Sequence, residues 1–161
     1  MNTKEFFTKT LKEEQKKFRD IIEALPEDQF AHKVHEKARE AGNLAAPLTA
    51  QWEAISGILL TGVPAFNAHA MEANSRAEML STFDTGYAEL LKNVENISIE
   101  DWENGMGVLD MGPNGKWEDK KYGMAWGFLF DAIHHRGQLS TYLRAMGARV
   151  PSIYGPSADT Q

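Results

Sequence analysis

Hydrophobic residues recur at helical spacing in four long stretches of the chain. The first stretch opens with a capping box, Asn2-x-x-Glu5, and carries apolar residues at every third or fourth position until Pro26. This pattern predicts a helix from Thr3 to about Leu25.

The second stretch has a proline inside its apolar pattern, which runs to Gly62. Pro47 would remove one backbone hydrogen bond and costs about 3 kcal/mol in a helix interior. The predicted helix is therefore either kinked at Pro47 after a start near Ala38, or begins near Asn43.

The third stretch begins with another capping box, Ser75-x-x-Glu78, and predicts a helix that ends near Asn96. Residues 98–118 lose the helical spacing and are rich in glycine. They predict a long crossover with a small hairpin within Val108–Trp117.

The fourth stretch predicts a helix from about Asp119 to Met146, followed by Gly147 in the left-handed position that often ends a helix. The tail, residues 149–159, is rich in proline, glycine and serine but also contains apolar residues, so we expect it to pack back on the helices. Four long helices with little strand signal predict an all-α four-helix bundle, with residues 1–161 as a single domain.

Composition restricts the chemistry that this bundle can perform. The chain has 161 residues, 42% of them hydrophobic, and no cysteine, so any metal ligand must be a histidine, a carboxylate or another oxygen. A formal net charge of −6 argues against a nucleic acid partner. No apolar run approaches the roughly 20 residues that span a membrane. We therefore expect a cytoplasmic protein whose partners are small molecules or other proteins.

A polar cluster interrupts the apolar pattern of the fourth predicted helix. Asp131 and His135 lie one turn apart on the line that also carries Phe128 and Tyr142, so we expect the pair to face inward. Two interpretations are open at this point. The pair could supply two ligands to a divalent metal, or it could be a hydrogen-bonded polar pair in the core.

Three neighbours of this pair are expected to have other roles. His134 is assigned a structural role or a place at an interface. Arg136 points away from the pair, so we expect it to bind an acidic residue of another helix or chain. Gly137 costs about 1 kcal/mol relative to alanine in a helix interior, which indicates the close approach of another backbone.

The C-terminal part of the chain resembles the DinB/YfiT-like superfamily of four-helix proteins. The residues that carry the resemblance are His134-His135-Arg136-Gly137-Gln138-Leu139, Tyr142-Leu143-Arg144 and the segment from Pro151 to Asp159. Members typically hold a divalent metal, often nickel or zinc, with one histidine from helix two and an H-x-x-x-H pair from the last helix. Several are thiol-dependent transferases or isomerases, and the family commonly forms homodimers.

Transferred to this sequence, the H-x-x-x-H pair falls on Asp131 and His135, while the helix-two ligand falls on Pro47, which cannot coordinate. Gln51, one turn further, is the substitute that we select. The alternatives are Glu53, under a shifted alignment, and the histidines His32, His35 and His69. The resemblance thus implies a partly degenerate site for nickel or zinc.

Three functions are compatible with these observations. The first is a metal-dependent enzyme that activates a low-molecular-weight thiol or a water molecule. The second is a non-catalytic module whose aromatic cavity holds a small ligand, with the polar pair of the last helix as its anchor. The residues expected to line that cavity are Trp52, Trp126, Phe128 and Tyr142. The third is a structural homodimer, which is compatible with either of the others.

Overall fold

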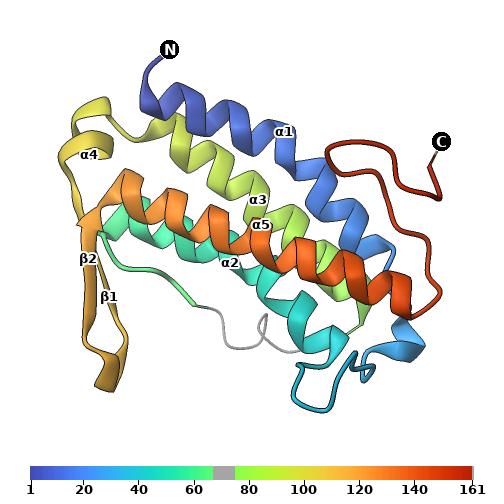
Figure 1. Ribbon diagram of the computed structural model, residues 1–161. Helices are drawn as coiled ribbons and strands as arrows, with labels where there is room; N and C mark the ends of the chain where they lie inside the picture. Colours follow the sequence, from blue (N-terminus) through green and yellow to red (C-terminus); the bar gives the residue numbers. More distant parts are fainter. Residues whose placement is uncertain (67–74, 161) are drawn as a thin grey trace.

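Four long helices form a bundle in the computed structural model, which describes residues 1–66 and 75–160. The long helices are α1 (Thr3–Glu23), α2 (Ala41–Thr61), α3 (Arg76–Asn96) and α5 (Lys121–Ala145) (Figure 1). Helix α1 packs against α3 and α5, and α2 packs against the same two helices. The predicted four-helix bundle is confirmed.

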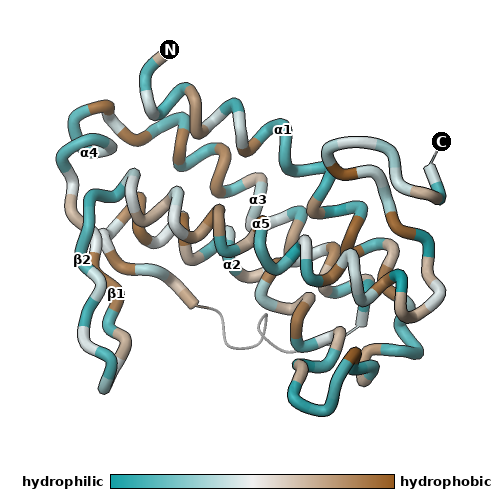
Figure 2. The backbone as a smooth tube through the Cα atoms, viewed as in Figure 1, coloured by the Kyte–Doolittle hydropathy of each residue, from teal (hydrophilic) through white to brown (hydrophobic). Residues whose placement is uncertain are grey.

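Both predicted capping boxes form. The side chain of Asn2 accepts a hydrogen bond from the backbone N–H of Glu5 at 2.8 Å, and Ser75 and Glu78 repeat this arrangement at the start of α3. Helix α1 then buries one face, whose residues are Phe7, Leu11, Glu14, Phe18, Ile21 and Ile22. Figure 2 shows the corresponding changes between hydrophilic and hydrophobic residues along α1.

Helix α2 begins at Ala41, between the two predicted starts, and continues through Pro47 as one helix. It is buried on most of its sides, and it ends at Gly62, whose φ of 80° is left-handed. Even so, no helix in the described part of the chain combines the length and the apolar composition needed to cross a membrane.

The crossover between α3 and α5 contains a short helix that the sequence did not predict. Helix α4 (Ile99–Asn104) is capped by the side chain of Ser98 and buries Trp102. The predicted hairpin follows, with β1 (Met106–Asp110) antiparallel to β2 (Lys116–Lys120). Figure 1 shows α4 and the hairpin at one end of the bundle. The described residues also form two 3-10 turns, η1 (Glu27–Gln29) and η3 (Gly112–Asn114).

The hairpin packs against α5 at Gly127. A Cβ atom at this position would lie 2.5 Å from the ring of Trp117, so a side chain there would displace the tryptophan. The same ring stacks on Phe128, with the centroids 6.0 Å apart. Helix α5 starts at Lys121, later than the predicted Asp119, because β2 continues to the residue before it.

The C-terminal tail packs back on the helices, as predicted. Asp159 forms an ion pair of 2.8 Å with Arg144 of α5, and the hydroxyl of Tyr154 donates to the Glu14 carboxylate of α1 at 3.0 Å. Gly147 follows α5 with a φ of 71°, which confirms its predicted role in ending the helix.

Candidate functional site

Asp131 and His135 face each other on α5. The Nε2 atom of His135 lies 3.5 Å from Oδ1 of Asp131, and its Nδ1 atom lies 3.0 Å from Oε1 of Gln138. A protonated imidazole can donate to both oxygens. The side chain of Asp131 is 57% exposed and that of His135 is 17% exposed. Contrary to the sequence-based expectation, the pair therefore does not face the bundle centre.

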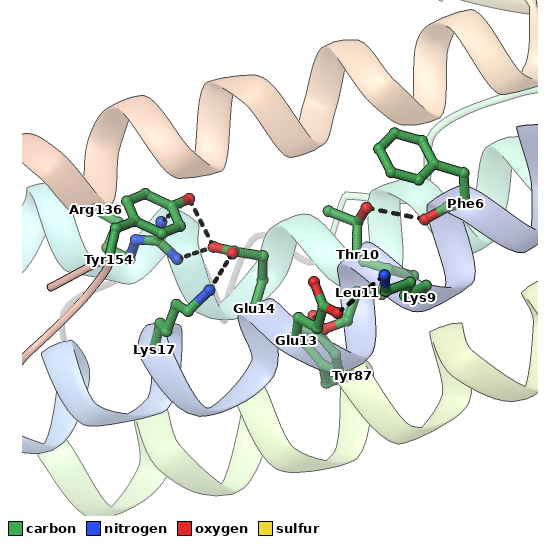
Figure 3. Close-up of polar contacts among 10 residues, drawn as sticks. All are labelled: Phe6, Lys9, Thr10, Leu11, Glu13, Glu14, Lys17, Tyr87, Arg136 and Tyr154. Carbon is green, nitrogen blue, oxygen red and sulfur yellow. Dashed lines mark hydrogen bonds and ion pairs between the residues drawn. The ribbon is translucent and has the colours of Figure 1, made fainter.

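Arg136, and not the pair, faces the bundle centre. Its guanidinium donates to Oε2 of Glu14 at 2.5 Å through Nη1, and to the hydroxyl of Tyr154 at 2.7 Å through Nη2 (Figure 3). The expected acidic partner on another helix is thus present. Because the inward line of α5 passes through Arg136, Asp131 and His135 lie on the flank of α5 that adjoins α2.

Glu14 is buried and charged, in a network that joins α1, α5 and the tail. Burial raises its pKa, but the hydrogen bonds from Lys17 and Arg136, the charge of Arg136 and the hydroxyl of Tyr154 outweigh burial, so the pKa is lowered. The ring of Tyr154 also lies 4.6 Å from Nζ of Lys17. All these polar groups are paired, which indicates a structural role.

Gln51 of α2 completes the polar group on the flank of α5. Its Nε2 atom donates to the carbonyl oxygen of Phe128 at 2.6 Å and to Oδ2 of Asp131 at 3.1 Å. Its Oε1 atom is buried and has no hydrogen-bond partner among the described residues. The structure thus brings the three predicted metal ligands, Gln51, Asp131 and His135, into one chain of contacts.

This arrangement does not fit a preformed metal centre. Gln51 presents its amide nitrogen to Asp131, and an amide nitrogen with two protons has no lone pair to give to a metal. Turning the amide would place its oxygen against the carbonyl oxygen of Phe128. No three histidine or acidic side chains converge within residues 1–66 and 75–160. Asp131 and His135 alone supply fewer donors than the three protein ligands usual at catalytic zinc.

The alternative ligands do not join this group. Glu53 faces α3. His32 packs against the ring of Tyr142 with the centroids 6.4 Å apart, and its Nε2 atom is buried with no partner among the described residues. His35 accepts a hydrogen bond from the backbone two residues later. His69 lies outside the described residues.

Two hollows adjoin the Asp131 and His135 pair. The smaller, of about 90 Å³, is lined by Pro47, Ala50, Gln51, Phe66, Phe128 and Asp131. The larger, of about 400 Å³, lies between α5 and the segment that leads into α2, and we name it the His135 cleft. Its α5 wall consists of His135, Gln138, Thr141 and Tyr142. Its opposite wall consists of Val34, Ala38, Arg39 and Leu44.

The structure does not place the four predicted aromatic residues around one cavity. Trp52 is fully buried and packs against Phe18 in the core, and Trp126 packs against phenylalanines of α1. Phe128 lines the smaller hollow, whereas Tyr142 lines the His135 cleft. Only these last two adjoin the polar pair.

Sequence reasoning missed two residues that shape this region. Glu14 occupies the apolar stripe of α1 between Leu11 and Phe18, and this position was the available signal for a buried acid facing Arg136. Arg39 precedes α2 in a non-helical segment, where no periodicity indicates which side chains reach the cleft.

Comparisons with known proteins agree with the fold. A model of the DinB family matches residues 126–161, which include Asp131 and His135. The crystal structure of YjoA, a DinB-like protein from Bacillus subtilis, is similar with a TM-score of 0.69 over 94% of this chain and 99% of that chain. The two sequences are 16% identical, so this likeness establishes the fold alone. No curated protein matches the sequence.

Proposed function

Because the family match and the fold support membership of the DinB-like superfamily, we propose that this chain binds a small organic molecule in the His135 cleft. Asp131 and His135 act as the polar anchor at the edge of this cleft. The proposal rests mainly on the Gln51 amide, whose nitrogen points at Asp131 where a third metal-coordinating atom would be required.

The His135 cleft has the size and the chemistry of a small-molecule site. Its volume of about 400 Å³ lies within the range of roughly 300–1,000 Å³ that is usual for ligand pockets. Val34, Ala38 and Leu44 supply apolar surface, and burying such surface stabilises a complex by about 25 cal/mol per Å². His135 and Gln138 supply polar groups that can orient the ligand.

A second candidate is a metal-dependent transferase that uses a low-molecular-weight thiol, as the family resemblance implies. Two observations favour it: Asp131 and His135 are close enough to share one ion, and Oε1 of Gln51 has no hydrogen-bond partner among the described residues. A bound nickel or zinc ion would lower the pKa of a thiol. This candidate requires a third protein ligand in addition to Asp131 and His135.

We further propose a homodimer that pairs through the exposed face of α5. Trp126 and Phe130 lie with their ring centroids 5.4 Å apart, and Phe130 is 60% exposed. Gly137 shares this face, and apart from its chain neighbours and the adjacent backbone of α5, no described atom lies within 4 Å of the place where its Cβ would be. The close backbone that Gly137 predicts is therefore absent from the described residues of this chain, and a second copy could supply it.

A fragment screen by ligand-observed NMR separates the two candidate functions. The full chain is screened in the presence of EDTA and again with added zinc. We expect the same fragments to bind under both conditions, to be lost in His135→Ala, and to be retained in the matched control His134→Ala, because His134 is exposed and does not line the cleft. Fragments that bind only with zinc, together with zinc-dependent consumption of a thiol, would support the transferase instead.

A further inference from the structure

The His135 cleft contains a cation that has no partner among the residues that the structure describes. Arg39 lines the cleft, and its guanidinium makes no hydrogen bond or ion pair with the described residues. By contrast, Arg19, Arg136 and Arg144 each bind an acidic side chain. An arginine that lines a concave surface without an acidic partner is available to a ligand.

The backbone of Arg39 is held against α5. The hydroxyl of Tyr142, which also lines the cleft, donates to the carbonyl oxygen of Arg39 at 2.9 Å. Tyr142 itself is 6% exposed, so this contact connects the segment before α2 to a side chain fixed in the core. The position of the Arg39 backbone is therefore fixed by the fold, which lowers the conformational entropy that is lost when a ligand binds the side chain.

The charges near the cleft favour a ligand with one negative charge. Glu40, next to Arg39 in the sequence, forms an ion pair of 3.5 Å with Lys33. A second carboxylate, that of Asp131, lies 3.5 Å from the imidazole of His135. The Asp131 carboxylate would repel a phosphate with two negative charges about twice as strongly as a carboxylate with one. The planar guanidinium matches a carboxylate in a bidentate geometry.

We propose that the His135 cleft binds a small monocarboxylate with a short apolar body. Its carboxylate would lie on Arg39, its apolar part against Val34 and Leu44, and its far end near His135 and Gln138. This inference rests on the proposed function and adds the class of ligand to it.

The test uses three probes that share an apolar chain and differ in the head group: hexanoate, hexanol and hexylamine. Dissociation constants are measured by chemical shift perturbation on the isotopically labelled full chain. We expect hexanoate to bind at least about tenfold more tightly than hexanol, because a hydrogen bond to a charged group is worth about that factor, and hexylamine to bind most weakly. Shifts should be largest at His135, Gln138 and Leu44.

Two variants that each remove one positive charge distinguish a specific contact with Arg39 from a general effect of the net charge of the protein. Arg39→Gln keeps most of the side-chain length and should reduce the preference for hexanoate over hexanol to within about twofold. Arg149→Gln, which removes an arginine outside the cleft, should leave the preference unchanged. A preference that survives in Arg39→Gln overturns the inference.

The remaining outcomes distinguish this inference from the proposed function. If hexanol binds in the His135 cleft as tightly as hexanoate, the carboxylate assignment fails and the proposed function stands. Hexyl phosphate is measured as a fourth probe, and if it binds about tenfold more tightly than hexanoate, the restriction to one negative charge is wrong. If none of the probes shifts the signals of the cleft, both the inference and its premise are contradicted.

Discussion

The side-chain amide of Gln51 on α2 donates to the Asp131 carboxylate on α5 at 3.1 Å and to the carbonyl oxygen of Phe128 at 2.6 Å. These two acceptors fix which atom of the amide faces Asp131, and that atom is the nitrogen. The position that a metal site would fill with a coordinating atom thus holds a hydrogen-bond donor. The hydrogen bond from the uncharged Gln51 amide connects α2 to α5 and holds Asp131 beside His135.

Introducing a second histidine on α5 should create metal affinity. Asp131→His places two imidazoles at i and i+4 on α5, a spacing that suits one divalent ion. We expect nickel to bind at least about tenfold more tightly to this variant than to the wild type, as measured by isothermal titration calorimetry. Asp131→Asn is the matched control and should bind no better than the wild type. Equal nickel affinity in all three proteins would refute the view that the wild-type site lacks metal-coordinating atoms.

The buried ion pair of Arg136 and Glu14 should contribute strongly to stability. Removing one partner leaves a buried charge, so Arg136→Met should lower the free energy of unfolding by about 3–5 kcal/mol in urea denaturation. The double variant Glu14→Leu/Arg136→Met should lose less than the sum of the two single losses. Lys9→Ala, which removes one partner of an exposed ion pair, should cost no more than about 1 kcal/mol. Additive losses in the double variant would contradict the pairing.

Acid should weaken the fold through Glu14. Its pKa in the folded state lies below the ordinary value of 4.5, so folding is favoured by its charged form above that pH, and this contribution is lost as the pH falls through the folded-state pKa. Wild-type protein should therefore lose more free energy of unfolding between pH 6 and pH 3 than Glu14→Gln, measured in urea at each pH. Parallel curves for the two proteins would show that Glu14 does not carry this dependence.

The sequence predicted the long helices well because their signals are local. The capping boxes at Asn2 and Ser75 and the stop at Gly147 each depend on a few adjacent residues, and all three form. Helix α4 was missed because six residues are too few to show a helical period.

The orientation of the polar cluster could not be read from α5 alone. The line through Asp131, His135 and Tyr142 and the line through Arg136 both carry apolar neighbours, so the periodicity of α5 does not say which line faces the centre. Glu14 decides this, because a buried acid on α1 requires a cation opposite it. That information lies on another helix, and it was present in the apolar stripe of α1.

The exposed aromatic face of α5 should hold a homodimer together. Phe130→Lys replaces an exposed ring with a charge and should convert a dimer to a monomer in sedimentation velocity experiments. Met111→Lys, at another exposed apolar residue on the hairpin end, is the control and should remain dimeric. A wild-type protein that is monomeric at about 100 µM would contradict the proposed dimer.

The metal content of untagged protein shows whether Gln51, Asp131 and His135 hold an ion. Inductively coupled plasma mass spectrometry is applied before and after dialysis against nickel, zinc and manganese, with His135→Ala as the control. Gln51 presents a hydrogen-bond donor where a metal-coordinating atom is needed. We therefore expect far less than one equivalent of metal per chain, and no difference between the wild type and His135→Ala. Close to one equivalent of metal in the wild type, lost in His135→Ala, would show that this group is a metal site and would favour the metal-dependent transferase.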